Sequence, residues 1–90
     1  VLALMAAFSL HAATPREQLV LAEEAEDTYA QIELLRRILD AEPADADGQE
    51  KLIRAWLRVS DYAMARRALE AWPAAPEDFR TTVSAQILFE

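Results

Sequence analysis

The chain has 90 residues with one Gly, four Pro and no Cys, and hydrophobic residues make up 53% of it. The formal net charge of −7 argues against a nucleic-acid-binding protein, which needs a basic surface to neutralise phosphates. The absence of Cys excludes a disulfide framework and a thiolate metal site. The charge is uneven: residues 14–50 hold eleven acids and three bases, whereas residues 51–90 hold five acids and six bases.

The first segment, Val1–Leu10, is a charge-free apolar run that is too short to span a bilayer. Its length fits the hydrophobic part of a secretory signal, and the small residues Ala12 and Ala13 after His11 could serve as the cleavage site. We therefore predict that residues 1–13 are a signal peptide whose positively charged beginning is missing, and that the mature chain is exported to the bacterial periplasm or secreted. The alternative is that residues 1–12 form the second helix of an earlier repeat.

A first helix is predicted to begin at Thr14, because Thr14, Pro15 and Glu17 form a capping-box pattern. Leu19, Ala22 and Ala25 give this helix an apolar stripe, and Leu21 is a further candidate for it. A turn is expected near residue 26.

A second helix is predicted to carry apolar residues at spacings of three and four and to end before Pro43. Asp45 or Asp47 then caps a third helix, which breaks near Ser60. These patterns predict turns near residues 43 and 60.

A fourth helix is expected from about Tyr62 to Trp72, ended by the proline-containing turn 73–76. Glu77 and Asp78 begin a fifth helix, with Val83, Ile87 and Leu88 as its apolar residues. The sequence thus predicts an all-α protein in which one set of side chains is buried together: Leu35, Leu52, Trp56, Ala65 and Leu69.

A 34-residue period links the second and fourth helices: each begins after an aspartate, at Asp27 and at Asp61. Such a period is typical of helix-turn-helix repeats, whose stacked copies share one core and present a concave surface to a partner. Residues 14–90 are therefore expected to form antiparallel helix-turn-helix repeats that are incomplete at the carboxyl end. A generic helical bundle is the alternative.

Residues 14–90 resemble tetratricopeptide repeats. Seven residues carry the resemblance: Leu52 and Trp56 on the first helix of a repeat, Asp61-Tyr62 at the turn, Ala65 as the small residue at the helix crossing, Leu69 as the large one, and Pro43 as the closing proline. The sequence departs from the family pattern at Pro15, Ala22, Gln31, Ile53 and Trp72. The resemblance implies an α-solenoid that binds a protein or peptide partner in a groove lined by the first helices.

The residues that could carry chemistry form no catalytic or metal-binding pattern, since His11 is the only histidine and the three serines lack a glycine-flanked elbow. The acids between Glu23 and Asp27 are interpreted as a solvated helix end. We therefore predict no enzyme, no cofactor and no stable insertion of the mature chain in a membrane.

Glu50, Arg54 and Arg58 recur at four-residue intervals on the predicted third helix, and Leu57 adjoins them. The resemblance places these four residues in the groove, and Arg suits the recognition of carboxylates because its planar fork can bind both oxygens. The alternative for Glu50 and Arg54 is an ordinary helix-stabilising pair. The alternative for the whole chain is a structural or oligomerisation segment of a larger, possibly enzymatic, protein.

Overall fold

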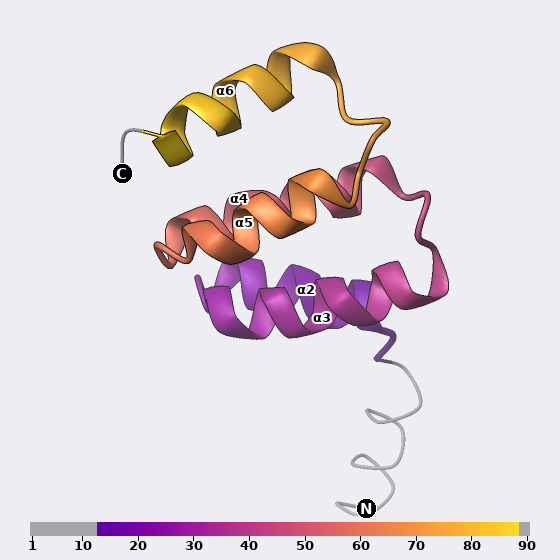
Figure 1. The fold of residues 1–90 in the computed structure, drawn as a ribbon. Helices are drawn as coiled ribbons and strands as arrows, with labels where there is room; N and C mark the ends of the chain where they lie inside the picture. Colours follow the sequence, from indigo (N-terminus) through magenta and orange to yellow (C-terminus); the bar gives the residue numbers. More distant parts are fainter. Residues whose placement is uncertain (1–12, 89–90) are drawn as a thin grey trace, which may run out of the picture.

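The computed structural model describes residues 13–88, which contain five helices and no strand. The helices are α2 (Pro15–Glu24), α3 (Thr28–Ala41), α4 (Ala46–Arg58), α5 (Tyr62–Glu70) and α6 (Glu77–Leu88). Each helix packs against the next one in the chain, so that the α2/α3 pair, the α4/α5 pair and α6 follow one another as successive layers (Figure 1). The predicted all-α, repeat-like architecture is confirmed. The predicted signal peptide, residues 1–13, falls almost entirely outside the described range.

The turns inside the two complete helix pairs have the same backbone geometry, 34 residues apart. Glu26 and Ser60 both adopt the left-handed conformation, with φ of 56° and 61°. The amide of Asp27 donates to the carbonyl of Ala22 at 3.0 Å, and the amide of Asp61 donates to that of Trp56 at 2.9 Å. Both hydrogen bonds are typical of a helix C-terminus that ends in a left-handed residue, the Schellman motif. The turns predicted near residues 26 and 60 are therefore confirmed.

The left-handed residue of the first turn gives a test of this geometry. A left-handed conformation costs a residue with a Cβ about 1–2 kcal/mol, and glycine avoids this cost. Glycine also makes the unfolded chain more flexible, which offsets part of the gain in stability. We expect Glu26→Gly to raise the free energy of unfolding by roughly 0.5–1 kcal/mol. The same chemical change at the exposed Glu33, inside α3, should lower it by about 1 kcal/mol. Urea denaturation of both variants measures these changes in the free energy of unfolding. A loss of stability in Glu26→Gly would show that Glu26 does not adopt the left-handed conformation.

The beginnings of the helices are held by side-chain caps. The capping box at Thr14 is present: the Glu17 amide donates to Thr14 Oγ1 at 3.2 Å, and the Thr14 amide donates to Glu17 Oε1 at 3.2 Å. Of the two candidates for the cap of α4, the structure uses Asp45, which accepts a hydrogen bond from the Gly48 amide at 3.2 Å. These local signals were predicted from the sequence because they lie within one helical turn of each other.

Asp45 also joins the first helix to the turn between α3 and α4. Arg16, near the start of α2, donates to Asp45 at 2.8 Å and also binds Glu42. The hydrogen bond from Arg16, followed by that from the Gly48 amide, holds the pKa of the Asp45 carboxyl below its ordinary value. The bridge fixes the first helix pair against the end of the turn predicted near residue 43.

The core runs continuously through all five described helices. The five side chains predicted to be buried together belong to it, and both tryptophans, Trp56 and Trp72, are 9% exposed. Two expectations for α2 are wrong: Leu21 is 63% exposed and Ala25 is exposed. Leu19 and Ala22 are the buried residues of α2, and Leu21 lies two residues, or about 200°, around the helix from Leu19.

The turn that leads into the last helix is held by contacts between Trp72, Phe79 and Arg80. Helix α5 ends at Glu70, two residues earlier than predicted, because Trp72 precedes Pro73 and is disfavoured in the helical conformation. The Trp72 ring instead meets the Phe79 ring edge to face, with centroids 5.9 Å apart, and Arg80 donates to the Trp72 carbonyl at 2.7 Å. Leu88, one of the three apolar residues expected on this helix, is 77% exposed at the end of α6, whereas Val83 and Ile87 are buried.

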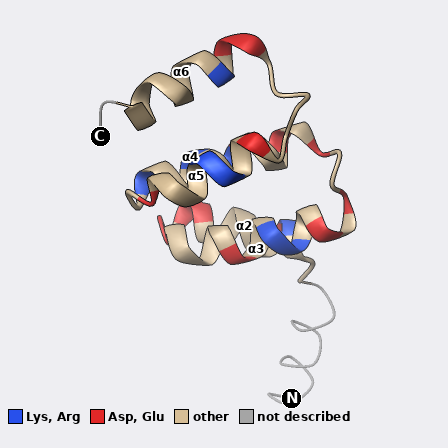
Figure 2. Cartoon of the chain, viewed as in Figure 1, with Lys and Arg blue, Asp and Glu red and all other residues tan. Residues whose placement is uncertain are grey.

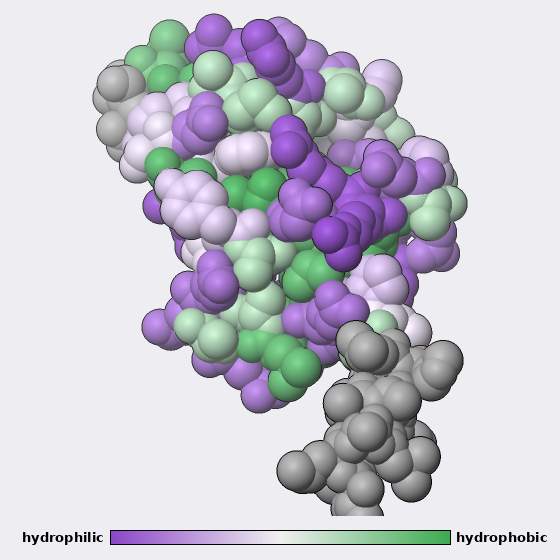
Figure 3. Space-filling view, turned by 90° about the horizontal axis from the view of Figure 1, so that it is seen from below, coloured by the Kyte–Doolittle hydropathy of each residue, from purple (hydrophilic) through white to green (hydrophobic). Residues whose placement is uncertain are grey.

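Charged residues are spread along the chain, and basic and acidic segments both lie along α4 (Figure 2). On the face drawn in Figure 3, hydrophobic areas are small and separated by hydrophilic ones. Within residues 13–88, no helix is both long and apolar enough to cross a bilayer.

Candidate functional site

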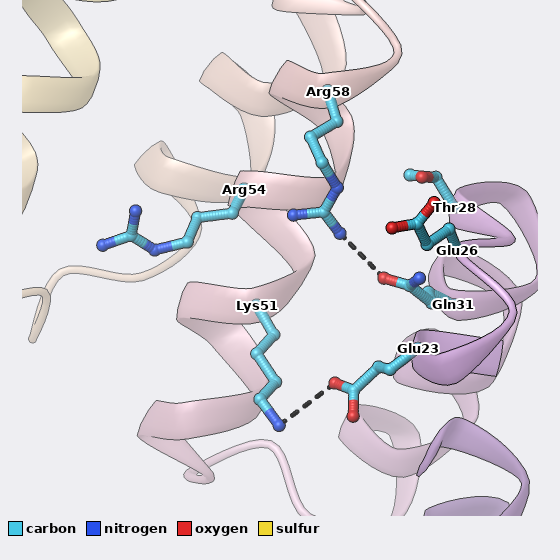
Figure 4. Close-up of a pocket in the computed structure, with 7 residues that line it drawn as sticks. All are labelled: Glu23, Glu26, Thr28, Gln31, Lys51, Arg54 and Arg58. Atoms are coloured by element: carbon cyan, nitrogen blue, oxygen red, sulfur yellow. Dashed lines mark hydrogen bonds and ion pairs between the residues drawn. The ribbon is translucent and has the colours of Figure 1, made fainter. Parts of the chain in front are cut away.

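Helix α4 lies between two surface hollows, and polar side chains of α4 line both of them. The first, between α4 and the α2/α3 pair, has a volume of about 590 Å³ and is called the α2/α4 hollow. It is lined by Glu23, Glu26, Thr28, Gln31, Lys51, Arg54 and Arg58 (Figure 4). Its size is within the range of about 300–1,000 Å³ that is usual for ligand sites.

The second hollow lies between α4 and α6, has a volume of about 370 Å³ and is called the α4/α6 hollow. Glu50, Arg54 and Leu57 line its α4 side, and Asp78, Phe79 and Gln86 are among the residues that line its α6 side. A smaller hollow between Arg54, Leu57, Arg58 and Gln86 lies beside both. We call these three hollows together the groove.

All four residues predicted to contact a partner line the groove. Glu50, Arg54 and Leu57 line the α4/α6 hollow, while Arg54 and Arg58 line the α2/α4 hollow. The four-residue spacing placed them on one side of α4, but the guanidinium groups of Arg54 and Arg58 point to different sides of it (Figure 4). The structure therefore spreads the predicted positive stripe across the groove.

Arg54 reaches toward α6. Its guanidinium carbon lies 5.3 Å from the centre of the Phe79 ring, a cation–π contact, and its Nη2 is 3.3 Å from the carboxylate of Glu50. The Arg54 side chain is still 58% exposed. The Glu50–Arg54 pair expected as the ordinary alternative is thus present, and such an exposed pair stabilises a helix by only about 0.2–0.5 kcal/mol. Most of the Arg54 surface stays open to a ligand.

Arg58 reaches toward α3, where its Nη2 donates to the Gln31 side-chain oxygen at 2.7 Å. Among residues 13–88 no carboxylate lies within ion-pair distance of Arg58. Its one side-chain partner is a neutral amide. The charge of Arg58 is therefore held in the α2/α4 hollow without being neutralised by an ion pair.

Lys51 closes the same hollow toward α2. Its Nζ lies 3.3 Å from Glu23 and 3.5 Å from Asp47. Burial of the ammonium by itself lowers the pKa of Lys51, but the two carboxylates together outweigh this effect and the pKa lies above its ordinary value. Lys51 thus lines the α2/α4 hollow as a charged residue that is already paired with two carboxylates, Glu23 and Asp47.

Sequence reasoning missed Gln31, Lys51 and Phe79. Lys51 lies one helical turn before Arg54 and could have been found by extending the charge pattern on α4. Gln31 was noted only as a departure from the tetratricopeptide pattern. Phe79 gave no local signal, because it comes from another helix.

The described residues contain no group of three or more His, Asp or Glu side chains placed to hold a metal ion. Comparison with known proteins finds no family model, curated protein or solved structure that matches the chain. What the groove can do is therefore argued from its own side chains. They offer an open surface of mixed charge, with three basic residues, Lys51, Arg54 and Arg58, beside four acidic ones, Glu23, Glu26, Glu50 and Asp78.

Proposed function

We propose that the chain is a tetratricopeptide-like interaction module, not an enzyme, and that it binds an acidic segment of a partner protein along the groove. The observation that carries this proposal is Arg58, whose positive charge lines the α2/α4 hollow without an acidic partner. A carboxylate can bind such a guanidinium through two parallel hydrogen bonds.

The arrangement of Arg54 supports an extended segment rather than a single small ligand. Arg54 borders all three hollows, so that a chain lying across α4 would meet Arg58 on one side and Arg54 with Leu57 on the other. The α2/α4 hollow is lined by charged and polar side chains, whereas the α4/α6 hollow also has Leu57 and Phe79, so the groove suits a peptide with both acidic and apolar side chains. The repeated 34-residue turn geometry supports the tetratricopeptide-like assignment, because stacking of equivalent helix pairs produces such a surface.

The proposal is tested by selection from a random library of displayed twelve-residue peptides, with the complete protein as bait. We expect the selected peptides to be enriched in Asp and Glu, and to compete with one another for one site. Selected peptides without acidic enrichment would overturn the proposed partner chemistry. A chain that selects no peptide at all and instead self-associates in sedimentation experiments would favour the structural or oligomerisation role.

We also propose that the module is exported, on the basis of the apolar run Val1–Leu10 and the small residues after it. Expressed in a bacterium with its natural upstream residues, the protein should mature to an amino terminus near Ala13 or Thr14. Mass spectrometry of periplasmic and cytosolic fractions measures this. Uncleaved protein confined to the cytosol would refute export and favour the earlier-repeat alternative for residues 1–12.

A further inference from the structure

Gln31 is the one buried polar side chain of the described residues, with 6% of its surface exposed. It lies in the first turn of α3 and uses both ends of its amide. Its Nε2 donates to the Ala22 carbonyl at the end of α2 at 3.2 Å, and its Oε1 accepts from Arg58 of α4 at 2.7 Å. One amide thereby connects three helices.

The next helix pair shows that packing does not require this amide. Ala65, 34 residues later, is fully buried at the equivalent place on α5. The two backbones match there. The backbone N–H of Gln31 donates to the Asp27 carbonyl at 3.0 Å, and the backbone N–H of Ala65 donates to the Asp61 carbonyl at 3.0 Å. The Ala22 carbonyl bound by Gln31 also accepts from the Asp27 amide, so it does not depend on Gln31 for a partner. The distinctive contact of Gln31 is therefore the one with Arg58.

We propose that Gln31 is a positioning residue that holds the Arg58 guanidinium at the wall of the groove, ready for a carboxylate of the partner. This inference rests on the proposed function. Because the amide is neutral, it orders the guanidinium without cancelling its charge. A carboxylate at position 31 would order the same group but would neutralise it. Ordering the arginine in advance reduces the entropy that binding must otherwise remove from a long side chain.

A first measurement needs no ligand. Nitrogen-15 NMR of the arginine side chains reports the rate of rotation about the Nε–Cζ bond of each guanidinium. We expect slow rotation for Arg58 in the parent chain, and faster rotation in Gln31→Ala while the exposed Arg66 and Arg67 stay unchanged. Equal Arg58 rotation rates in the parent and in Gln31→Ala would refute the positioning role, whatever the fate of the proposed function.

A second measurement uses an acidic twelve-residue peptide obtained by the library selection. Gln31→Ala should weaken its binding about two- to tenfold, from the cost of ordering one side chain on binding. Gln31→Glu should weaken binding further, because the new carboxylate occupies Arg58. In a chain that already carries Arg58→Ala, replacing Gln31 by Ala should have no further effect on affinity.

The outcomes separate the two proposals. A role of Gln31 in packing alone predicts lower stability in urea for the position-31 variants, with Arg58 rotation and peptide affinity unchanged. An affinity loss on Gln31→Ala that persists in the Arg58→Ala background would also refute positioning through Arg58. If selection gives no acidic peptide, the proposed function fails, and the NMR measurement still decides whether Gln31 orders Arg58.

Discussion

Replacing Leu35 by Ala is expected to lower the free energy of unfolding by about 2–5 kcal/mol, the usual cost of removing a buried leucine side chain and leaving a cavity. Leu35 is 2% exposed and lies in the core where α3 meets its neighbours. Small domains are stable by only about 5–15 kcal/mol in total, so this change removes a large part of the stability. The measurement is urea unfolding followed by circular dichroism.

Leu21→Ala is the matched control, because Leu21 is also a helical leucine but is 63% exposed. It should change the free energy of unfolding by no more than about 0.5 kcal/mol. Equal losses in the two variants would contradict the assignment of Leu35 to the core and of Leu21 to the surface.

Replacing Ala65 by Leu is expected to cost about 1–3 kcal/mol through overpacking. Ala65 is fully buried in α5, which packs on α4, so a larger side chain at this position would have to enter the core. Ala63→Leu, on the exposed side of the same helix, makes the same chemical change without that constraint. Coinciding urea midpoints for Ala65→Leu and the parent chain would show that α4 and α5 do not approach closely at this residue.

The helices and turns could be predicted because their signals are local. Asp27, Asp61 and Thr14 cap helices through bonds to amides three residues away, and Pro43 limits the end of α3. Such patterns are visible in a short stretch of sequence. The mistakes at Leu21 and Ala25 have a different origin, since periodicity shows that a helix has an apolar side but not which residues meet a neighbour.

The groove could be predicted only in part. The spacing of Arg54 and Arg58 placed both on one side of α4, and both do line the groove. The directions of their side chains depend on Phe79 and Gln31, which lie 25 and 27 residues away in the chain. No pattern within α4 contains that information. Only the packing of α3, α4 and α6 brings these partners together.

The role of Gln31 illustrates the same limit. In the sequence it was a departure from the small residue expected at a helix crossing. In the structure its amide fits at the crossing because one end meets the Ala22 carbonyl and the other meets Arg58. A buried polar group is costly unless it is hydrogen-bonded, and both ends of this one are.

The most direct test of the account is the affinity of a selected acidic peptide for two double variants, Arg54→Ala with Arg58→Ala and Arg66→Ala with Arg67→Ala. Both change the net charge equally, but Arg66 and Arg67 are exposed on α5 and lie outside the groove. An exposed charge pair contributes about 0.2–1 kcal/mol, so loss of both groove arginines should weaken binding by about two- to thirtyfold.

Calorimetry at two salt concentrations, with helicity checked by circular dichroism, measures this difference. Salt screens exposed charges over about 10 Å at 0.1 M, so the loss should be larger at low salt. We expect the Arg66 and Arg67 variant to keep most of the parent affinity and the Arg54 and Arg58 variant to lose it. Equal affinities of the two folded variants would contradict this expectation and return Arg54 and Arg58 to ordinary helix surface.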